Sequence, residues 1–212
     1  MNILGIDTTK KQAYVFGVFN GKKVIDILPA TEKHSENLLT HIEGVLNFNQ
    51  VDISEIDVFA NVSGPGSFTG IRIGLTTVKA LNLPFNKKIV NINVFEGLKS
   101  YIKNGVLLLE CTQSSVYFGK YKNSKVIDYG VLDYDQLANQ AFDCPIYVLQ
   151  EEQLNLPLSY KVNVIKNYAN LILEQIILEV NNSSFTKTPM PFYIALSQAE
   201  KNLLEKERSP KE

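Results

Sequence analysis

Residues 63–75 read Ser-Gly-Pro-Gly-Ser-Phe-Thr-Gly-Ile-Arg-Ile-Gly-Leu, and this glycine-rich stretch joins a strand-like apolar run at 58–62 to a helix-like run that reaches Leu83. Glycine permits positive φ angles and close approach of two backbones. The serine and threonine of the stretch can cap the free N–H groups at the start of a helix. Such a junction either binds an anion on those N–H groups or forms a tight turn that seats the helix on a sheet. The residues alone leave both functions open.

The glycine spacing excludes two well-known phosphate-binding loops. A Walker-type loop requires Gly, four residues and then Gly-Lys-Ser or Gly-Lys-Thr. Here five residues separate Gly64 from Gly70, and Ile71 and Arg72 follow. The dinucleotide-binding fingerprint would need glycine at position 69, where the chain has Thr69.

Composition narrows the class of protein. The 212 residues, 45% of them apolar, can bury a core as one domain or two small ones. A net charge of −1 and a pI near 6.2 give no general attraction for a nucleic-acid backbone. The chain opens without the features of a signal peptide, and no apolar run approaches the about 20 residues that span a bilayer. Cys111 and Cys144 lie in apolar surroundings and fit no metal-ligand spacing, so we expect buried, reduced thiols. We therefore expect a soluble cytoplasmic protein that meets no membrane.

The chain carries one pattern twice. A strand-like run, a polar turn, a second strand, an Asn-Gly turn and a return strand open the sequence. The same order recurs after residue 105, with Glu110-Cys111-Thr112 in the polar turn. Phe16-Gly17 aligns with Phe118-Gly119, and one residue must be dropped in the turn to align Asp7 with Glu110.

Helical periodicity predicts the remaining elements. In the first half, helices at 35–48 and 70–83 flank the strand at 58–62. The second of these helices is apolar on two sides, so it packs on the sheet and on either a second protein or a neighbouring helix. In the second half we expect a helix at 168–180, a short strand at 192–196 and a helical tail after residue 197. The prediction is an α/β fold of two closely packed β-β-β-α units, residues 1–104 and residues 105–212.

Two tandem units of this kind resemble the actin, heat-shock chaperone and sugar-kinase (ASKHA) fold, in which RNase H-like units normally hold ATP at the hinge between them. Residues 64–75 are similar, more specifically, to the TsaB (YeaZ-type) family, bacterial proteins that take part in forming threonylcarbamoyladenosine in tRNA. Shorter segments agree from end to end: residues 3–9, His34-Ser35-Glu36, Val116-Tyr117 and Gln198-Ala199-Glu200. The chain departs from the family where it has Glu110-Cys111-Thr112 for the usual Asp-Ala-Arg, and Ala195 for an arginine. These departures argue against a nucleotide role for the second unit.

The resemblance implies a non-catalytic subunit of the threonylcarbamoyl-transfer complex. In the family, TsaB docks on and supports the catalytic subunit TsaD, and the ATPase TsaE completes a ternary complex. We expect this chain to require no cofactor of its own, and its charge balance favours only indirect contact with tRNA. An exposed apolar pair of helices would self-associate, so we expect a homodimer when the chain is alone. Whether ATP or ADP binds at the partner interface stays open.

The same resemblance implies a docking face built from the helices at 35–48 and 70–83. Periodicity alone does not separate side chains that face a partner from those that face the sheet. The candidate interface residues are His34, Glu36, Leu38, Leu39, Ile42, Ile71, Arg72, Leu75 and Val78. Arg72 could pair with a partner carboxylate or a phosphate, or with Asp57 or Glu96 of the same chain.

Two turns hold the candidates for ligand chemistry. Asp7, Thr8 and Thr9 suit a hydrated Mg²⁺ beside a phosphate, or they cap a turn, which is the interpretation that we favour. With the glycine stretch they form a candidate vestigial phosphate loop: Asp7, Thr8, Thr9, Gly64, Gly66, Ser67, Thr69 and Gly70.

Histidine spacing argues against a metalloenzyme. His34 and His41 are the only histidines, and seven residues of helix separate them by ~10.5 Å of rise. Ligand bonds to one metal are about 2 Å long, so one ion cannot join them. We therefore assign no metal and no catalytic residue. The alternative is an enzyme, a stand-alone ASKHA-type ATPase or small-molecule kinase, which Asp7 and the glycine stretch favour and the altered second unit disfavours.

Overall fold

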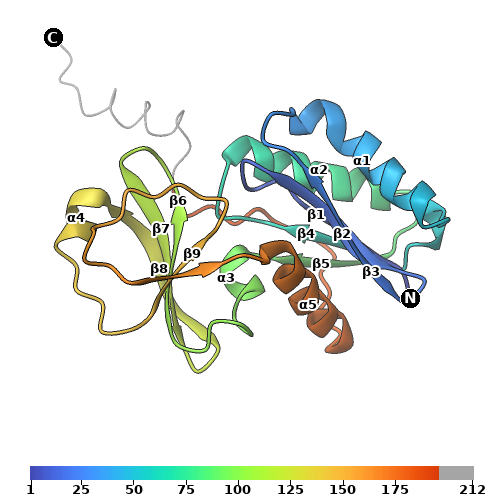
Figure 1. The fold of residues 1–212 in the computed structure, drawn as a ribbon. Helices are drawn as coiled ribbons and strands as arrows, with labels where there is room; N and C mark the ends of the chain where they lie inside the picture. Colours follow the sequence, from blue (N-terminus) through green and yellow to red (C-terminus); the bar gives the residue numbers. More distant parts are fainter. Residues whose placement is uncertain (196–212) are drawn as a thin grey trace, which may run out of the picture.

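The computed structural model describes residues 1–195. The helical tail expected after residue 197 and the Gln198-Ala199-Glu200 segment therefore lie outside the described residues. The described chain forms two five-stranded sheets, with helices packed on both faces of the first (Figure 1).

The first sheet has the strand order β3-β2-β1-β4-β5. β1, β2 and β3 are antiparallel neighbours, whereas β4 and β5 run parallel to β1. Helices α1 (His34–Phe48) and α2 (Phe68–Asn82) lie side by side on one face of this sheet (Figure 1). A 3-10 turn, η1 (Ile53–Glu55), precedes β4. The strands are β1 Ile3–Asp7, β2 Ala13–Phe19, β3 Lys22–Leu28, β4 Val58–Val62 and β5 Lys88–Ile92.

The second sheet repeats this plan. Its order is β10-β9-β6-β7-β8, with β6, β7 and β8 antiparallel and β9 and β10 parallel to β6. The short helix α4 (Tyr134–Ala138) follows β8 where α1 follows β3. The strands are β6 Gly105–Glu110, β7 Ser115–Lys122, β8 Lys125–Asp133, β9 Ile146–Leu149 and β10 Val162–Ile165.

Strand register shows how the two units correspond. Leu4 pairs with Gly17 in the first unit, and Leu107 pairs with Gly119 in the second. Asp7 and Glu110 each lie three residues beyond those leucines, so they occupy equivalent strand ends. The one-residue deletion that the sequence alignment required is therefore present in the structure. The predicted α/β fold of two tandem RNase H-like units is confirmed.

The last described part of the chain does not stay with the second sheet. Helix α5 (Tyr168–Asn181) packs on β2 and β5 of the first sheet, on the face opposite α1 and α2, and on the short helix α3 (Val94–Gly97) (Figure 1). Its apolar stripe joins the core cluster that also holds residues of both sheets. We expected residues 105–212 to form one unit; instead, burial of this stripe returns the chain to the first unit.

The expected strand at 192–196 is also not formed within the described residues, which end at 195. Residues 191–195 run without regular structure, and only the backbone N–H of Phe192 donates to a strand-end carbonyl, that of Ser63. Pro191, immediately before this segment, has no backbone N–H to donate. The two helices of the expected docking face begin one or two residues before their predicted starts.

The two cysteines are not both buried. Cys144 is exposed and Cys111 is half-buried, so the expectation of two buried thiols is wrong for Cys144.

His41 links α1 to the edge strand β3. Its Nδ1 lies 2.6 Å from Asp26 Oδ2, and its Nε2 lies 3.4 Å from Glu32 Oε2. The hydrogen bond to Asp26 raises the pKa of His41 above the ordinary value, partial burial opposes the rise, and Glu32 adds to it. Protonated His41 is thus favoured in the folded state.

A raised folded-state pKa contributes stability that is full below the unfolded-state pKa of about 6.5 and lost as pH rises through the folded-state value. His41→Gln should therefore lower the free energy of unfolding by up to about 1 kcal/mol near pH 5, the size typical of partly exposed ion pairs, and by much less near pH 9. Urea unfolding at the two pH values measures the difference. Asp26→Asn should remove the same pH dependence, and an equal loss at both pH values would contradict this account.

Candidate functional site

Asp7, at the end of β1, is fully buried, and each of its carboxylate oxygens accepts a hydrogen bond. Its Oδ1 accepts a hydrogen bond from the backbone N–H of Thr9 at 2.8 Å, and its Oδ2 accepts one from the Tyr168 hydroxyl at 2.6 Å. Burial, together with the charge of Asp7, raises the pKa of Tyr168 well above its usual range. The carboxylate thus caps the turn, the role that we favoured from the sequence. It also binds Tyr168 of α5, a contact that the sequence did not indicate.

The glycine turn seats α2 directly on the β1–β2 loop. Thr8 Oγ1 donates to the carbonyl of Gly70 at 2.6 Å, and the N–H of Ser67 donates to the carbonyl of Thr9 at 2.8 Å. A Cβ on Gly66 would overlap the backbone carbonyl of Thr9, and a Cβ on Gly70 would overlap the backbone carbonyl of Thr8. Glycine is required here because backbone meets backbone.

The remaining polar groups of the turn act on the helix and the adjoining chain. Ser67 caps α2 through Oγ, which accepts from the N–H of Gly70 at 3.2 Å. Gly64 has a φ of +122°, and its carbonyl accepts from the N–H of Val94 at 2.7 Å. Thr69 is exposed on the first turn of α2.

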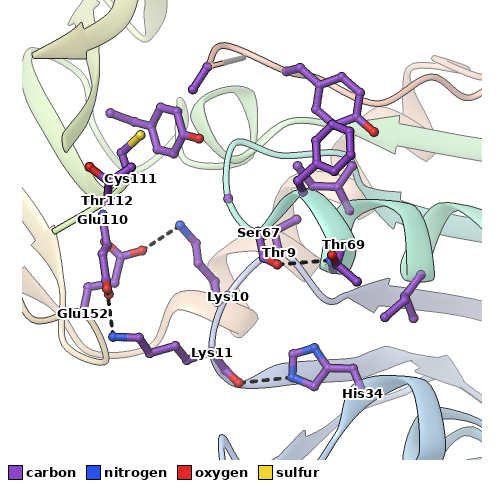
Figure 2. Close-up of a pocket in the computed structure, with 18 of the residues that line it drawn as sticks. Thr9, Lys10, Lys11, His34, Ser67, Thr69, Glu110, Cys111, Thr112 and Glu152 are labelled. Atoms are coloured by element: carbon purple, nitrogen blue, oxygen red, sulfur yellow. Dashed lines mark hydrogen bonds and ion pairs between the residues drawn. The ribbon is translucent and has the colours of Figure 1, made fainter. Parts of the chain in front are cut away.

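A cavity of about 610 Å³ lies between the two units, beside this turn (Figure 2). The β1–β2 loop and the starts of α1 and α2 form one side. Residues 110–112, Glu151 and Glu152 form the other side, and residues 192–195 also line it. Of the candidate phosphate-loop residues, Thr9, Gly66, Ser67, Thr69 and Gly70 line the cavity, whereas Asp7 and Thr8 are buried behind it.

Two lysines that line this cavity form ion pairs with glutamates of the second unit. Lys10 Nζ lies 2.7 Å from Glu152 Oε1, and both side chains are only 5% exposed. Lys11 Nζ lies 2.8 Å from Glu110 Oε1 (Figure 2). The second oxygen of Glu152 accepts the backbone N–H of Glu110 at 2.7 Å. Both loop lysines are therefore engaged by carboxylates of the second unit.

Glu151 adds a further acidic group at the same place. Burial raises the pKa of its carboxyl group above the usual range. The hydroxyl of Tyr14 donates to Glu151 Oε1 at 3.2 Å, and burial and the charge of Glu151 raise the pKa of Tyr14. A polyphosphate would have to displace the lysine partners in these acidic surroundings. Sequence reasoning missed Lys10 and Glu152, because the two paired residues are 142 positions apart in the chain.

The structure places most of the apolar docking candidates in the protein's own core. Leu39 alone is exposed, at 61%, because the stripe that recurs every three to four residues is the one that faces the sheet. Periodicity left open which of these residues face a partner and which face the protein's own sheet; the structure buries five of the six apolar candidates within the chain. The buried candidates are Leu38, Ile42, Ile71, Leu75 and Val78.

The polar docking candidates remain near the surface. His34 starts α1, and its Nε2 lies 3.1 Å from the carbonyl of Lys11. Glu36 pairs with Lys33 at 2.8 Å on the exposed first turn. Neither acidic partner that we considered for Arg72 is used: its guanidinium lies over the Phe68 ring, 3.9 Å from the centroid, and Nε donates to the Tyr193 hydroxyl at 3.1 Å.

Sequence reasoning missed two exposed apolar side chains at the C-terminal ends of the same helices. Phe48 ends α1 and is 84% exposed, and Leu83 caps the end of α2 and is 82% exposed. Both lie off the apolar stripe, so a search for helical periodicity passes over them. Both could have been found in the sequence as large apolar residues at helix positions outside the apolar stripe that faces the sheet.

Two tandem RNase H-like units with a cavity between them define a protein of the ASKHA class. The family model described as TsaD: tRNA N6-adenosine threonylcarbamoyltransferase matches residues 27–200, and the chain belongs to that family. The resemblance to its TsaB (YeaZ-type) members is confirmed by the relatives and structures that follow.

The relatives are distant. The chain is 24% identical over 137 residues to the tRNA threonylcarbamoyladenosine biosynthesis protein TsaB of Haemophilus influenzae, which covers 61% of this chain and 58% of the relative. It is 27% identical over 147 residues to the tRNA N6-adenosine threonylcarbamoyltransferase of Metallosphaera sedula. That alignment covers 61% of this chain and 43% of the relative. The alignments thus span about half the length of these two curated relatives.

Solved structures support the fold over nearly the whole chain. The structure of YeaZ from Pseudomonas aeruginosa superposes with a TM-score of 0.68 at 16% identity, covering 91% of this chain and 99% of that protein. Among residues 1–195, no helix is long and apolar enough to cross a membrane. Within the same described range, no three or more His, Cys, Asp or Glu side chains are grouped to hold a metal ion.

Substituting Gly70 tests the seating of α2. Gly70→Ala would drive a methyl group into the Thr8 carbonyl, so we expect the free energy of unfolding to fall by about 2 kcal/mol or more, as for other overpacked sites. Denaturant unfolding measures it. Gly44→Ala is the control, because an added methyl meets open space on exposed α1 and should stabilise by about 0.5–1 kcal/mol. A neutral Gly70→Ala would show that the seat is looser than the structure has it.

Proposed function

We propose that the chain acts in forming threonylcarbamoyladenosine in tRNA, as a non-catalytic subunit that docks on and supports a TsaD-like catalytic subunit. Family membership and the likeness to proteins named TsaB support the pathway. The observation that carries the docking role is the exposure of three large apolar side chains on α1 and at the end of α2: Leu39, Phe48 and Leu83. We call these three side chains the outer apolar residues.

The outer apolar residues are available because the core does not use them. Both helices bury their sheet-facing stripes completely, so the exposed side chains are surplus to folding. Large apolar side chains exposed on two neighbouring helices favour a protein partner. The same surface can pair with a second copy, which supports a homodimer when the chain is alone.

The cleft chemistry fits a supporting role. Lys10 of the β1–β2 loop is paired with Glu152 in a buried site, so it is not free to bind a phosphate, and the more exposed Lys11 is paired with Glu110. In this proposal the chemistry belongs to the TsaD-like partner, a TsaE-like ATPase joins the ternary complex, and any ATP or ADP binds at the partner interface. A net charge of −1 supports only indirect contact with tRNA.

Co-purification with the TsaD-like protein of the same cell tests the docking face. Leu39→Asp and Leu83→Asp should each reduce the amount of co-eluting partner at least about tenfold, because an interface centre tolerates an unpaired charge poorly. Leu158→Asp, on a fully exposed loop residue of the second unit, is the matched control and should co-elute normally.

Far-UV circular dichroism should show all three variants folded. Leu75 is unsuited to this test, because at 7% exposure its replacement by Asp would damage the core instead. Full co-elution of both docking variants would refute the assignment of this face.

The second candidate is a stand-alone ASKHA-type ATPase or small-molecule kinase, which the 610 Å³ cavity between the units favours. Calorimetry with ATP and Mg²⁺ on the isolated chain separates the two candidates. We expect neither saturable binding nor hydrolysis without partners. Steady turnover by the isolated chain would replace the subunit proposal with the enzyme.

A further inference from the structure

The β1–β2 loop reaches across the cavity into the second unit. Lys10 and Lys11 leave the first unit beside α1 and α2, and their ammonium groups end at carboxylates of the opposite wall (Figure 2). Glu110 ends β6, and Glu152 follows β9. Three separate segments of the chain therefore meet at one small group of charges.

The ion pair between Lys10 and Glu152, here called the inner pair, is buried and hydrogen-bonded on both carboxylate oxygens. Lys10 and Glu152 are each 5% exposed, and 2.7 Å separates their charged atoms. Glu152 uses its other oxygen to accept the N–H of Glu110, so the carboxylate is held from two directions. A buried charge that loses such a partner is strongly unfavourable, whereas the exposed pair Lys33–Glu36 at the rim of the same cavity has no such constraint.

We propose that Lys10 and Glu152 form a latch that holds the two units closed across the cavity, with the protein's own charges in the place of a bound ligand. Separation of the units would expose or orphan both buried charges. The closed arrangement is therefore the stable state of the chain without any ligand.

The latch is also tied to the starts of both long helices. The carbonyl of Lys11 lies 3.1 Å from His34 Nε2 at the start of α1. The carbonyl of Thr9 accepts the N–H of Ser67, which caps α2. Separation of Lys10 from Glu152 would therefore disturb the hydrogen bonds at the starts of α1 and α2. Movement of either helix would in turn displace the loop that carries Lys10.

Two measurements on the isolated full chain test the latch. Hydrogen exchange at the Glu110 amide reports the inner contact, because that N–H is bonded to Glu152. The distance between spin labels at Lys22→Cys on β3 and Gln140→Cys beyond α4, with Cys111 and Cys144 replaced by serine, reports separation of the units.

Lys10→Met keeps the aliphatic stem and removes the charge. It should speed exchange at Glu110 at least about tenfold and broaden the label distance toward longer values. Lys10→Arg keeps the charge and should leave both measurements close to those of the unaltered chain. Lys33→Met removes a lysine from the exposed rim pair and should change neither.

Should Lys10→Met fail to fold, Lys10→Met/Glu152→Gln removes both charges while leaving an oxygen for the Glu110 amide. This variant should fold and still show the longer label distances. The proposal is overturned if a folded Lys10→Met or the double variant keeps the original distance distribution. It is also overturned if Lys33→Met opens the cleft as much as Lys10→Met does.

Discussion

The structure depends on a close contact between two stretches of backbone, the β1–β2 loop and the turn that starts α2. Hydrogen bonds at Thr8 and Thr9 join the two stretches, and glycines at 66 and 70 leave the space in which they meet. Because β1 and β4 are parallel neighbours, this contact sets the position of α2 over the sheet. It also orients the loop so that its lysines point into the second unit.

The two long helices divide their apolar residues between folding and the surface. The apolar stripe of each helix packs on the first sheet, whereas Leu39, Phe48 and Leu83 remain exposed to solvent. This division explains why a partner surface and a core stripe can share one helix. Burial within the chain comes first, because the isolated fold must be stable before it can present anything to a partner.

The cleft between the units has the volume of a ligand site, but the two lysines of the β1–β2 loop that line it are paired with carboxylates of the second unit. Asp7, which stands where the second unit has Glu110, accepts hydrogen bonds from Thr9 and Tyr168 on both of its oxygens. Buried polar groups must find partners, and here the partners come from distant parts of the same chain. The polar residues that suggest phosphate chemistry in the sequence therefore serve in the structure to join segments.

Local pattern determined a large part of this protein. The Asn-Gly turn, the alternation of the early strands and the repeated Phe-Gly pair predicted the duplicated plan, down to the alignment of Asp7 with Glu110. These features are local because turn conformation and strand periodicity depend on neighbouring residues. Only the tertiary structure could tell which side of α1 and α2 is buried, that α5 returns to the first sheet, and that Lys10 meets Glu152. Each of these depends on contacts between residues far apart in the chain, about which periodicity carries no information.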